Sequence, residues 1–484
     1  MEVVNKHLEK YPSSLEILEG LYIFEKIRDR DKKFITKEVM KMDENIRQKI
    51  KECFLVQGKV QGEEKECFLI YAPLQMMLFA VNKKGRNAFL QLKRDKVVPG
   101  AEKILELLKN SKFNLVPSDL NRTPNADITI CPTFRCQLRC LYCFARGGER
   151  INDLSLNAAK AAIDLVLDRG ITLNSQISRL VWHGGGEPTL AWELLKEVSL
   201  YHRQKAITLG IKPRLSIVSN GIWTQEKRQW IINNFDRITV SCDGPSEIQN
   251  KQRPFFNGSF SSDQVYENLR FLAEQKANFG IRATITEYNV RQMPAMVQFF
   301  YDLCKPKVIQ FERLTVAGRC EQSKIEPGST KDFIDYFKEA FKIAKSLNIG
   351  LVSSGTRIFR RTKYYCGVAG YSFCVTPEGF LTTCHRVDNL LHPLADKLIF
   401  GKWDENKKQY EWKENQLFKL RKELSVDNFK ECQQCFCKYT CGGGCFARRA
   451  IDTNLQENCQ IIQELTQFRL LTIAEEKGIC KQVI

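Results

Sequence analysis

The 484-residue sequence has no uninterrupted apolar run that approaches the roughly 18 residues of a membrane-spanning helix. Its opening stretch, MEVVNKHLEKYPSS, lacks the apolar core of a secretory signal. No internal repeat or low-complexity tract stands out. These absences argue against a helical membrane protein, and they favour a cytoplasmic location in which thiols stay reduced.

An arginine-rich tail and a nucleic-acid fingerprint are also missing, although the formal net charge is +18. The basic residues are spread along the chain and mixed with acidic ones, as in QEKRQW. We therefore expect a solvated basic surface, with neither a nucleic acid nor a membrane as partner. An acidic polypeptide is a partner that the same charge would suit.

Cysteine, in contrast, is abundant, with 19 residues. In a reducing compartment this number favours metal ligands over a disulfide framework. The length and a hydrophobic content of 43% are typical of a globular protein with about two or three packed domains.

The middle of the chain alternates short β-rich runs with stretches that are apolar at helical spacing, such as LNAAKAAIDLVLDRG. The six runs that predict strands are 126–132, 179–184, 214–221, 237–244, 281–289 and 308–316. This alternation predicts an α/β fold with a parallel sheet. In such folds the chemistry lies at the carboxyl ends of the strands.

The first predicted strand runs into residues 131–148, which hold Cys131 and then the three-cysteine loop with Cys136, Cys140 and Cys143 in the spacing C-x3-C-x2-C. A closed zinc site or a four-iron cluster takes four anchors, so three thiolates leave one iron of such a cluster open. A zinc loop is the alternative for the triplet alone. We expect Cys131, on the strand itself, to be a buried core residue.

This loop resembles that of the radical S-adenosylmethionine (radical SAM) enzymes, whose hallmark is the same spacing with an aromatic residue before the third cysteine, here Tyr142. The resemblance implies a partial (β/α)6 barrel of the TIM type, in which S-adenosylmethionine binds the open iron. One electron then cleaves it to a 5′-deoxyadenosyl radical. The residues that the resemblance assigns to this cofactor are Tyr142, Gly185, Gly186, Glu187, Ser219, Asn220, Asp243 and Arg282. Taken singly, Ser, Asn and Asp at strand ends also commonly cap helices.

The C-terminal third has cysteines in the pattern C-x12-G-x4-C followed by C-x2-C-x5-C-x3-C and a last cysteine. This pattern resembles the SPASM extension of radical SAM enzymes, which carries auxiliary iron–sulfur clusters. The resemblance assigns Cys366, Cys384 and Cys445 to a first auxiliary set, and Cys432, Cys435, Cys441 and Cys459 to a second. It thus implies three [4Fe–4S] clusters. A zinc ribbon or knuckle is the alternative.

The first auxiliary set lacks a fourth cysteine at the expected place. Cys320, Cys374 and Cys437 are candidates at a distance, or that iron is open and binds a substrate thiolate, as in some thioether-forming relatives. The run VTPEGFLTTC predicts a β-hairpin that ends at Cys384. The remaining Cys53, Cys67, Cys304 and Cys480 are expected to be structural.

Residues 1–115 begin with helical periodicity, LEILEGLYIFEKI, and continue with the strand-like runs KECFLVQGKV and ECFLIYAPLQMMLFAVN. A helix is predicted at AEKILELLKN. This order resembles the winged-helix module with which many peptide maturases bind a leader peptide. An α+β lid is the alternative. The predicted domains are 1–115, this α+β region; 122–320, the barrel; 321–360, a connecting helix and linker; and 361–484, the cysteine-rich SPASM domain.

The resemblance predicts a peptide maturase that abstracts hydrogen from a ribosomally made precursor peptide and installs a thioether or carbon–carbon cross-link. Its expected partners are that precursor with its leader, and a reductant such as flavodoxin or ferredoxin.

Two alternatives stay open: an anaerobic sulfatase-maturating enzyme that makes formylglycine, and a non-catalytic zinc-binding adaptor. The sulfatase-maturating enzymes have an aspartate directly after the second ligand of the first auxiliary cluster, where this chain has His385. His385 is the candidate catalytic residue, because its reference pKa of about 6.5 would let it exchange protons near neutrality.

Overall fold

The computed structural model describes residues 42–59, 66–111, 120, 126–451 and 455–481. The predicted helical run at 15–27 lies outside these residues. So do residues 112–119 and 121–125, which directly precede the barrel. In the described part of the chain, no helix is long and apolar enough to cross a membrane.

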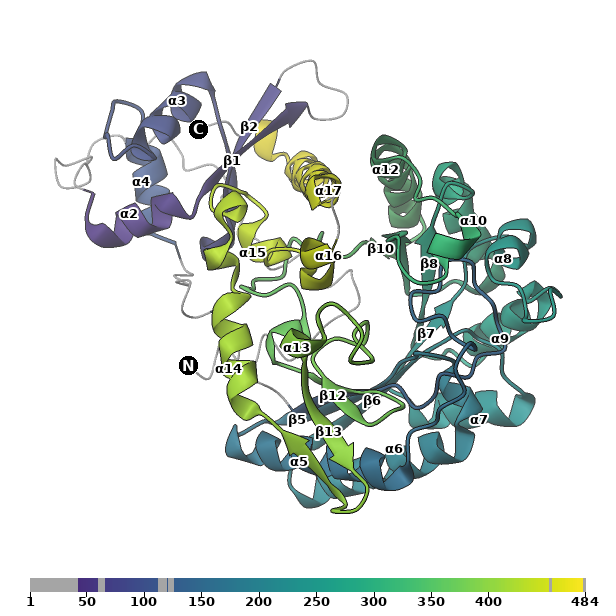
Figure 1. Cartoon of the computed structure of the whole chain (residues 1–484). Helices are drawn as coiled ribbons and strands as arrows, with labels where there is room; N and C mark the ends of the chain where they lie inside the picture. The colour runs from purple at the N-terminus through teal and green to yellow at the C-terminus, as the bar shows by residue number, and fades with distance from the viewer. Residues whose placement is uncertain (1–41, 60–65, 112–119, 121–125, 452–454, 482–484) are drawn as a thin grey trace.

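Six parallel strands form the centre of the molecule, as the alternating runs predicted. They are β4 (Ala126–Ile130), β5 (Ile177–Trp182), β6 (Lys212–Ser219), β7 (Arg237–Ser241), β8 (Phe279–Ile285) and β9 (Val308–Arg313). Each strand pairs with the next one along the chain, because a helical crossover returns the chain to the same edge. The sheet is curved (Figure 1). Its parallel strands, which alternate with helices along the chain, confirm the predicted α/β class.

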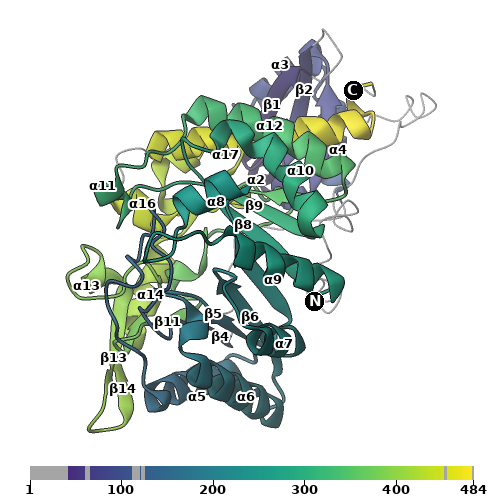
Figure 2. The same ribbon diagram turned by 90° about the vertical axis from the view of Figure 1, so that its right-hand side faces the viewer.

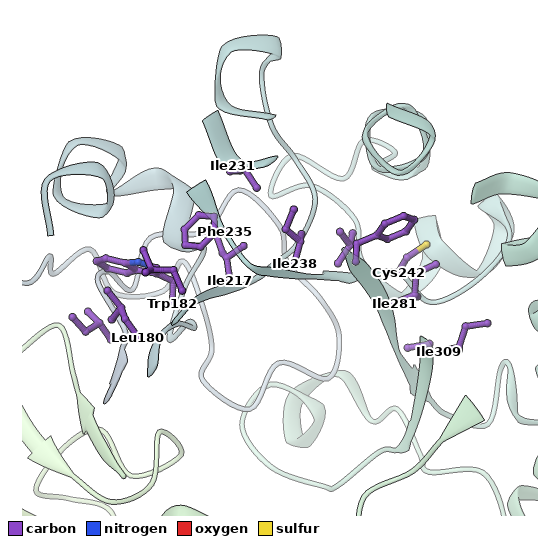
Figure 3. Packing of buried hydrophobic residues seen from close by; sticks show 14 of the residues in the cluster. Leu180, Trp182, Ile217, Ile231, Phe235, Ile238, Cys242, Ile281 and Ile309 are labelled. Atoms are coloured by element: carbon purple, nitrogen blue, oxygen red, sulfur yellow. The ribbon is translucent and has the colours of Figure 1, made fainter. Parts of the chain in front are cut away.

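Helices cover the outer side of this curved sheet (Figure 1). They are α5 (Leu156–Thr172), α6 (Trp192–Thr208), α7 (Gln225–Asn234), α8 (Ser246–Gln252), α9 (Ser262–Glu274), α10 (Met293–Cys304) and α12 (Thr330–Ser346). Ser155 begins α5 as its N-cap, accepting a hydrogen bond from the Ala158 N–H. Isoleucines from neighbouring strands, such as Ile217, Ile238 and Ile281, pack between sheet and helices and are buried (Figure 3).

The sheet extends beyond the six predicted strands at both edges and has eleven strands in all among the described residues. The short β10 (Gly350–Val352) pairs parallel with β9, and β11 (Phe373–Val375) pairs parallel with β4. The antiparallel strands β12 (Phe380–Thr382), β13 (Ile399–Asp404) and β14 (Gln409–Trp412) complete it. The predicted hairpin is therefore confirmed, with Cys384 two residues beyond its second strand.

The C-terminal third also holds helices, several of which carry cysteines. They are α11 (Cys320–Ser323), α13 (Ala395–Leu398), α14 (Glu414–Glu423), α15 (Lys438–Cys441), α16 (Phe446–Ile451) and the long α17 (Leu455–Glu476). Figure 2 shows the β13–β14 hairpin and the N-terminal sheet at opposite ends of the molecule.

The N-terminal unit is a three-stranded antiparallel sheet with helices on one face. Its elements are α2 (Glu44–Lys51), β1 (Phe54–Lys59), β2 (Glu66–Ala72), β3 (Met77–Val81), α3 (Lys83–Leu92) and α4 (Glu102–Lys109). The single strand-like run at 66–82 is in fact two strands. A tight turn at Pro73–Gln75 separates them, and Met76 after it has a left-handed φ of 54°.

The other face of this small sheet packs against α17, where Leu69 and Tyr71 contact Leu470 and Ile473. A disulfide joins Cys67 on β2 to Cys480 near the C-terminus, so these two predicted structural cysteines are bonded to each other. Cys53 and Cys304 are buried free thiols. The N-terminal unit and the cysteine-bearing helix α17 are thus packed together.

Candidate active site

The three-cysteine loop leaves the carboxyl end of β4 and folds back against the barrel. A bridge between Thr133 and Asp153 closes its base, and the Gly147 N–H donates to the Cys143 Sγ at 3.3 Å. The Arg139 guanidinium donates to the Cys136 carbonyl at 2.7 Å. The loop backbone is therefore held by the protein itself, which presents its three cysteines from a fixed frame.

A second arginine, Arg319, lies on the other side of this loop. Its guanidinium donates to the carbonyls of Cys140 at 3.0 Å and Gly147 at 2.9 Å, and its backbone N–H donates to the Cys143 carbonyl at 3.0 Å. Burial raises the pKa of Cys136 to about 12 and that of Cys140 to about 11. Buried thiols of this kind become thiolates when a metal binds them, so the donor set fits an iron–sulfur cluster.

The glycine turn after β5 packs directly behind the loop. A Cβ atom on Gly186 would lie 2.0 Å from the Arg135 carbonyl oxygen, and one on Gly185 would lie 2.6 Å from the Phe134 ring. Side chains cannot fit at either position, so only glycine allows this close approach. The structure thus places the predicted Gly185–Gly186 turn beside the residue that precedes Cys136.

Glu187 joins the ends of β5 and β6. Its buried carboxylate accepts hydrogen bonds from the Thr189 N–H and hydroxyl, from the Ser219 hydroxyl at 2.7 Å and from the Asn220 N–H at 2.8 Å. Burial raises the pKa of Glu187, and these hydrogen bonds oppose that shift. The Asn220 amide lies 4.0 Å from the Cys136 Sγ. Three predicted cofactor residues therefore meet at the first cysteine.

Tyr142 and Asp243 form a second buried group. The Tyr142 hydroxyl donates to the Asp243 carboxylate, which also accepts hydrogen bonds from the Gln252 side chain at 2.9 Å and the Thr284 N–H at 3.0 Å. Asp243 is fully buried. The side-chain oxygens of Tyr142 and Asp243 therefore all have hydrogen-bond partners within the protein. A contact of either residue with S-adenosylmethionine stays a prediction.

Two histidines stack where the barrel meets the C-terminal third. The His183 ring, just after β5, lies 4.5 Å from the His385 ring at an interplanar angle of 28°. The Phe144 ring, next to Cys143, lies 5.6 Å from His385. No sequence pattern predicted His183, whose one signal was its position directly before the glycine turn.

Arg282 on β8 acts electrostatically on both rings. Burial, aided by Arg282, lowers the pKa of His183 to about 4. Burial and the neighbouring His183 lower the pKa of His385 well below its usual range. This direction counts against proton exchange by His385 near neutrality, and its catalytic role stays a prediction. Arg282 itself lies in the same part of the barrel as these two rings, and its predicted contact with the cofactor carboxylate is untested.

The second auxiliary set lines a cavity of about 780 Å³ that includes open solvent. The cysteines around it are Cys432, Cys435, Cys437, Cys441, Cys445 and Cys459. Burial raises the pKa of Cys441 to about 12, and the thiols of Cys435, Cys432 and Cys459 raise it further. The structure thus brings together the four cysteines that the resemblance assigned to this set, with Cys437 and Cys445 beside them.

The first auxiliary set also assembles. Burial raises the pKa of Cys384 to about 11, and the Cys445 thiol adds to this rise. The Cys366 thiol interacts electrostatically with those of Cys384 and Cys445, and the Cys366 residue is exposed. These three thiols therefore lie within electrostatic reach of one another, and Cys445 also lines the cavity of the second set.

The three candidates for a fourth ligand differ in position. Cys320 packs beside Leu141 of the three-cysteine loop, and Cys437 hydrogen-bonds Cys435 of the second set, which lowers the Cys435 pKa to about 6. Cys374 lies within electrostatic reach of Cys384, yet its nearest thiol is Cys131 at 3.8 Å. Cys131 is buried, as predicted.

Within the described residues, no three His, Cys, Asp or Glu side chains converge on a point where a single metal ion would sit. A zinc ion needs its sulfur ligands at about 2.3 Å from one centre. A four-iron cluster is wider, so its thiolates stand further apart.

Comparison with known proteins agrees with this geometry. The family model of the radical SAM superfamily matches residues 130–300. An uncharacterized protein of Methanocaldococcus jannaschii is 29% identical over 200 residues, which are 39% of this chain and 66% of that protein. The Fe-coproporphyrin III synthase of Methanosarcina barkeri is 30% identical over 189 residues, which are 39% of this chain and 43% of that protein.

A longer match is to the cysteine-type anaerobic sulfatase-maturating enzyme of Clostridium perfringens, 25% identical over 382 residues that cover 70% of this chain and 95% of the relative. The solved structure of anSMEcpe with bound AdoMet has the same fold, with a TM-score of 0.57 at 19% identity over 73% of this chain and 96% of that one. Residues 130–300 therefore form a radical SAM domain.

Proposed function

We propose that this enzyme is a maturase that modifies a peptide substrate at the junction of the radical SAM domain and the C-terminal cysteine-rich region. The observation that carries the proposal is the contact between His385 and His183. His385 directly follows Cys384 of the first auxiliary set, and His183 precedes the glycine turn behind the three-cysteine loop. The stacked rings thus link the three-cysteine loop to the first auxiliary set. A reaction that needs the clusters of both sites requires them to be close together.

Cys136, Cys140 and Cys143 are the residues that would hold the cluster at which S-adenosylmethionine binds. When bound, these cofactors supply the 5′-deoxyadenosyl radical, which abstracts a hydrogen atom from the substrate. The protein contributes the frame: Arg139 and Arg319 fix the loop carbonyls, and Glu187 fixes the strand ends beside Cys136. The stacked imidazoles of His183 and His385 would position the substrate at this junction.

The two auxiliary sets would each hold a further [4Fe–4S] cluster that carries away the surplus electron. The first set has three cysteines in one group and an exposed Cys366, which supports an open iron that binds a substrate thiolate. The product would then be a thioether, or a carbon–carbon bond if no thiolate takes part. A cytoplasmic one-electron donor such as flavodoxin or ferredoxin would reduce the enzyme.

The N-terminal unit would bind the leader of the precursor peptide. Both β1 and β3 pair with β2 on one side only, so the small sheet has an edge strand at each end among the described residues. An extended peptide can add a strand to such an edge. The net charge of +18 favours an acidic leader.

The second candidate is an anaerobic sulfatase-maturating enzyme. The match to such an enzyme over 95% of its length favours it. Two features count against it: His385 stands where those enzymes have an aspartate, and that match covers only 70% of this chain.

Anaerobically reconstituted enzyme, given S-adenosylmethionine and a reductant, decides between the two with two substrates. One is a cysteine-bearing precursor peptide from a neighbouring reading frame, and the other is a cysteine-type sulfatase peptide. The proposal expects the precursor to lose two hydrogen atoms, with a new cross-link located by fragmentation mass spectrometry. Conversion of the sulfatase cysteine to an aldehyde, with the precursor unchanged, would establish the second candidate instead.

A further inference from the structure

Arg253 is a buried cation directly behind the three-cysteine loop. The residue is 7% exposed and stands at the end of α8. The backbone on either side of it is bonded to the loop: the Leu141 N–H donates to the Gln252 carbonyl at 3.0 Å, and the Arg139 N–H donates to the Pro254 carbonyl at 2.8 Å. Arg253 is therefore held at a fixed position relative to the loop.

Only some of the N–H donors of the Arg253 guanidinium have an acceptor within the protein. Its Nη1 donates to the Tyr142 hydroxyl at 2.7 Å. Its Nε is fully buried and has no hydrogen-bond partner among the described residues. Because a buried N–H without an acceptor is costly, such a group calls for an explanation. An acceptor that the protein chain does not supply is the simplest one.

The charges around this cation are arranged in two pairs. Asp243 faces Arg253 through the Tyr142 hydroxyl, and Glu149 lies 2.9 Å from the second loop arginine, Arg319. The Cys140 thiol, the Tyr142 hydroxyl and the Asp243 carboxylate all lie within electrostatic reach of Arg253. Arg253 is therefore close to a loop cysteine as well as to a carboxylate.

We propose that Arg253 is a positioning residue that sets the reduction potential of the iron–sulfur cluster held by Cys136, Cys140 and Cys143. Its Nε–H donates a hydrogen bond to a sulfur of that cluster, and its charge stabilises the reduced form. Hydrogen bonds to the sulfurs and the local charge are the two means by which a protein tunes such a potential. The step is the gain of one electron from an external donor, with no bond broken. This inference rests on the proposed function, because it requires a cluster in the loop.

A purely structural role would be to neutralise the buried Asp243 carboxylate. The two roles differ in the measurement that each would change. A structural pair changes the stability of the fold when broken, whereas a tuning residue moves the potential in a direction set by the sign of the charge removed.

The test is a potentiometric titration of the full chain, reconstituted with iron and sulfide and followed by electron paramagnetic resonance without substrate. The relevant signal is the one that changes when S-adenosylmethionine is added. Arg253→Met should lower the ratio of reduced to oxidised cluster at a fixed potential about tenfold, equal to ~59 mV for one electron. Arg253→Lys keeps the charge and should give a smaller shift. Asp243→Asn removes a negative charge and should shift the potential upward.

Arg203→Gln is the matched control, because Arg203 bonds Asn234 away from the loop. Arg253→Met with full iron and an unchanged potential would overturn the inference and leave the proposed function standing. A wild-type chain with no signal that responds to S-adenosylmethionine would instead defeat the proposed function.

If Arg253→Met misfolds, the double variant with Asp243→Asn removes the unpaired carboxylate and takes its place. Its shift should lie between those of the single variants. Loss of folding in the double variant and in Arg253→Lys alike would assign Arg253 a structural role only.

Discussion

At the scale of single residues, Glu187 accepts four hydrogen bonds from three residues at the ends of two strands. A carboxylate suits this place because all of its partners are donors. The carboxylate therefore fixes where Ser219 and Asn220 lie relative to Cys136. Its influence on the cofactor passes through this arrangement as well as through any direct contact.

Glu187→Gln should weaken S-adenosylmethionine binding and lower the free energy of unfolding by about 1–3 kcal/mol, because an amide NH₂ would face N–H and O–H donors. Isothermal calorimetry of the anaerobic protein and chemical denaturation measure the two effects. Glu193→Gln is the control, since that side chain is 82% exposed. Unchanged affinity would make the turn at Gly184–Glu187 a structural feature only.

His183→Phe keeps a ring beside His385 and removes the imidazole nitrogens. We expect modification of the peptide to fall at least tenfold, while cleavage of S-adenosylmethionine without peptide continues. Chromatography of 5′-deoxyadenosine and mass spectrometry of the peptide measure both. Equal losses of the two activities would show that His183 serves the cofactor and not the substrate.

His202 gives a pH dependence that is independent of the cysteines. It is fully buried, and its Nε2 lies 2.8 Å from the Ser178 hydroxyl, which itself donates to the Ala126 carbonyl. Nε2 must therefore carry the proton, which leaves Nδ1 bare. Burial lowers the pKa of His202 to about 4.

Because the unfolded chain binds this proton below a pH of about 6.5, stability should be full above that pH and fall by about 2–3 kcal/mol as the pH drops toward 4. His202→Gln should show a smaller fall over this window in urea denaturation. The same slope in both proteins would assign the pH dependence to other groups, such as His183.

At the scale of elements, the sequence predicted the six central strands and the motifs at their carboxyl ends, because buried parallel strands and amphipathic helices have strong periodicities. It did not predict that β10 and β11 extend the same sheet. Each has three residues, which is too short for a period to show. The contact between His183 and His385 was missed for another reason: the residues are distant in the sequence and belong to different strand ends, so no local pattern joins them.

The glycine turn after β5 allows a direct test of how closely this element packs against the three-cysteine loop. A Cβ on Gly186 would meet the Arg135 carbonyl at 2.0 Å, which is backbone that cannot move without shifting Cys136. Gly186→Ala should therefore lose the iron of the three-cysteine loop. Gly210→Ala is the control, because no atom lies within 4 Å of its Cβ, so the variant meets only the backbone cost of its φ of 71°, about 1–2 kcal/mol. Full iron in Gly186→Ala would contradict this close packing.

At the scale of the whole molecule, the three cysteine groups are linked by packing. The first auxiliary set reaches the radical SAM domain through His385, and the N-terminal unit contacts the second set through α17 and a 3.5 Å ion pair between Glu52 and Lys438. The sequence predicted the order of these regions along the chain, but it did not predict which of them pack together. Their contacts join residues hundreds of positions apart, for which a single sequence carries no signal.

The central claim is that the three-cysteine loop is the place where S-adenosylmethionine is cleaved. Its most direct test is to replace Cys136, Cys140 and Cys143 with Ala, then to measure 5′-deoxyadenosine and bound iron after anaerobic reconstitution. The account predicts that 5′-deoxyadenosine disappears and that iron falls by about four atoms per chain, one cluster's worth, while the auxiliary iron stays. A variant that still produced 5′-deoxyadenosine would contradict it.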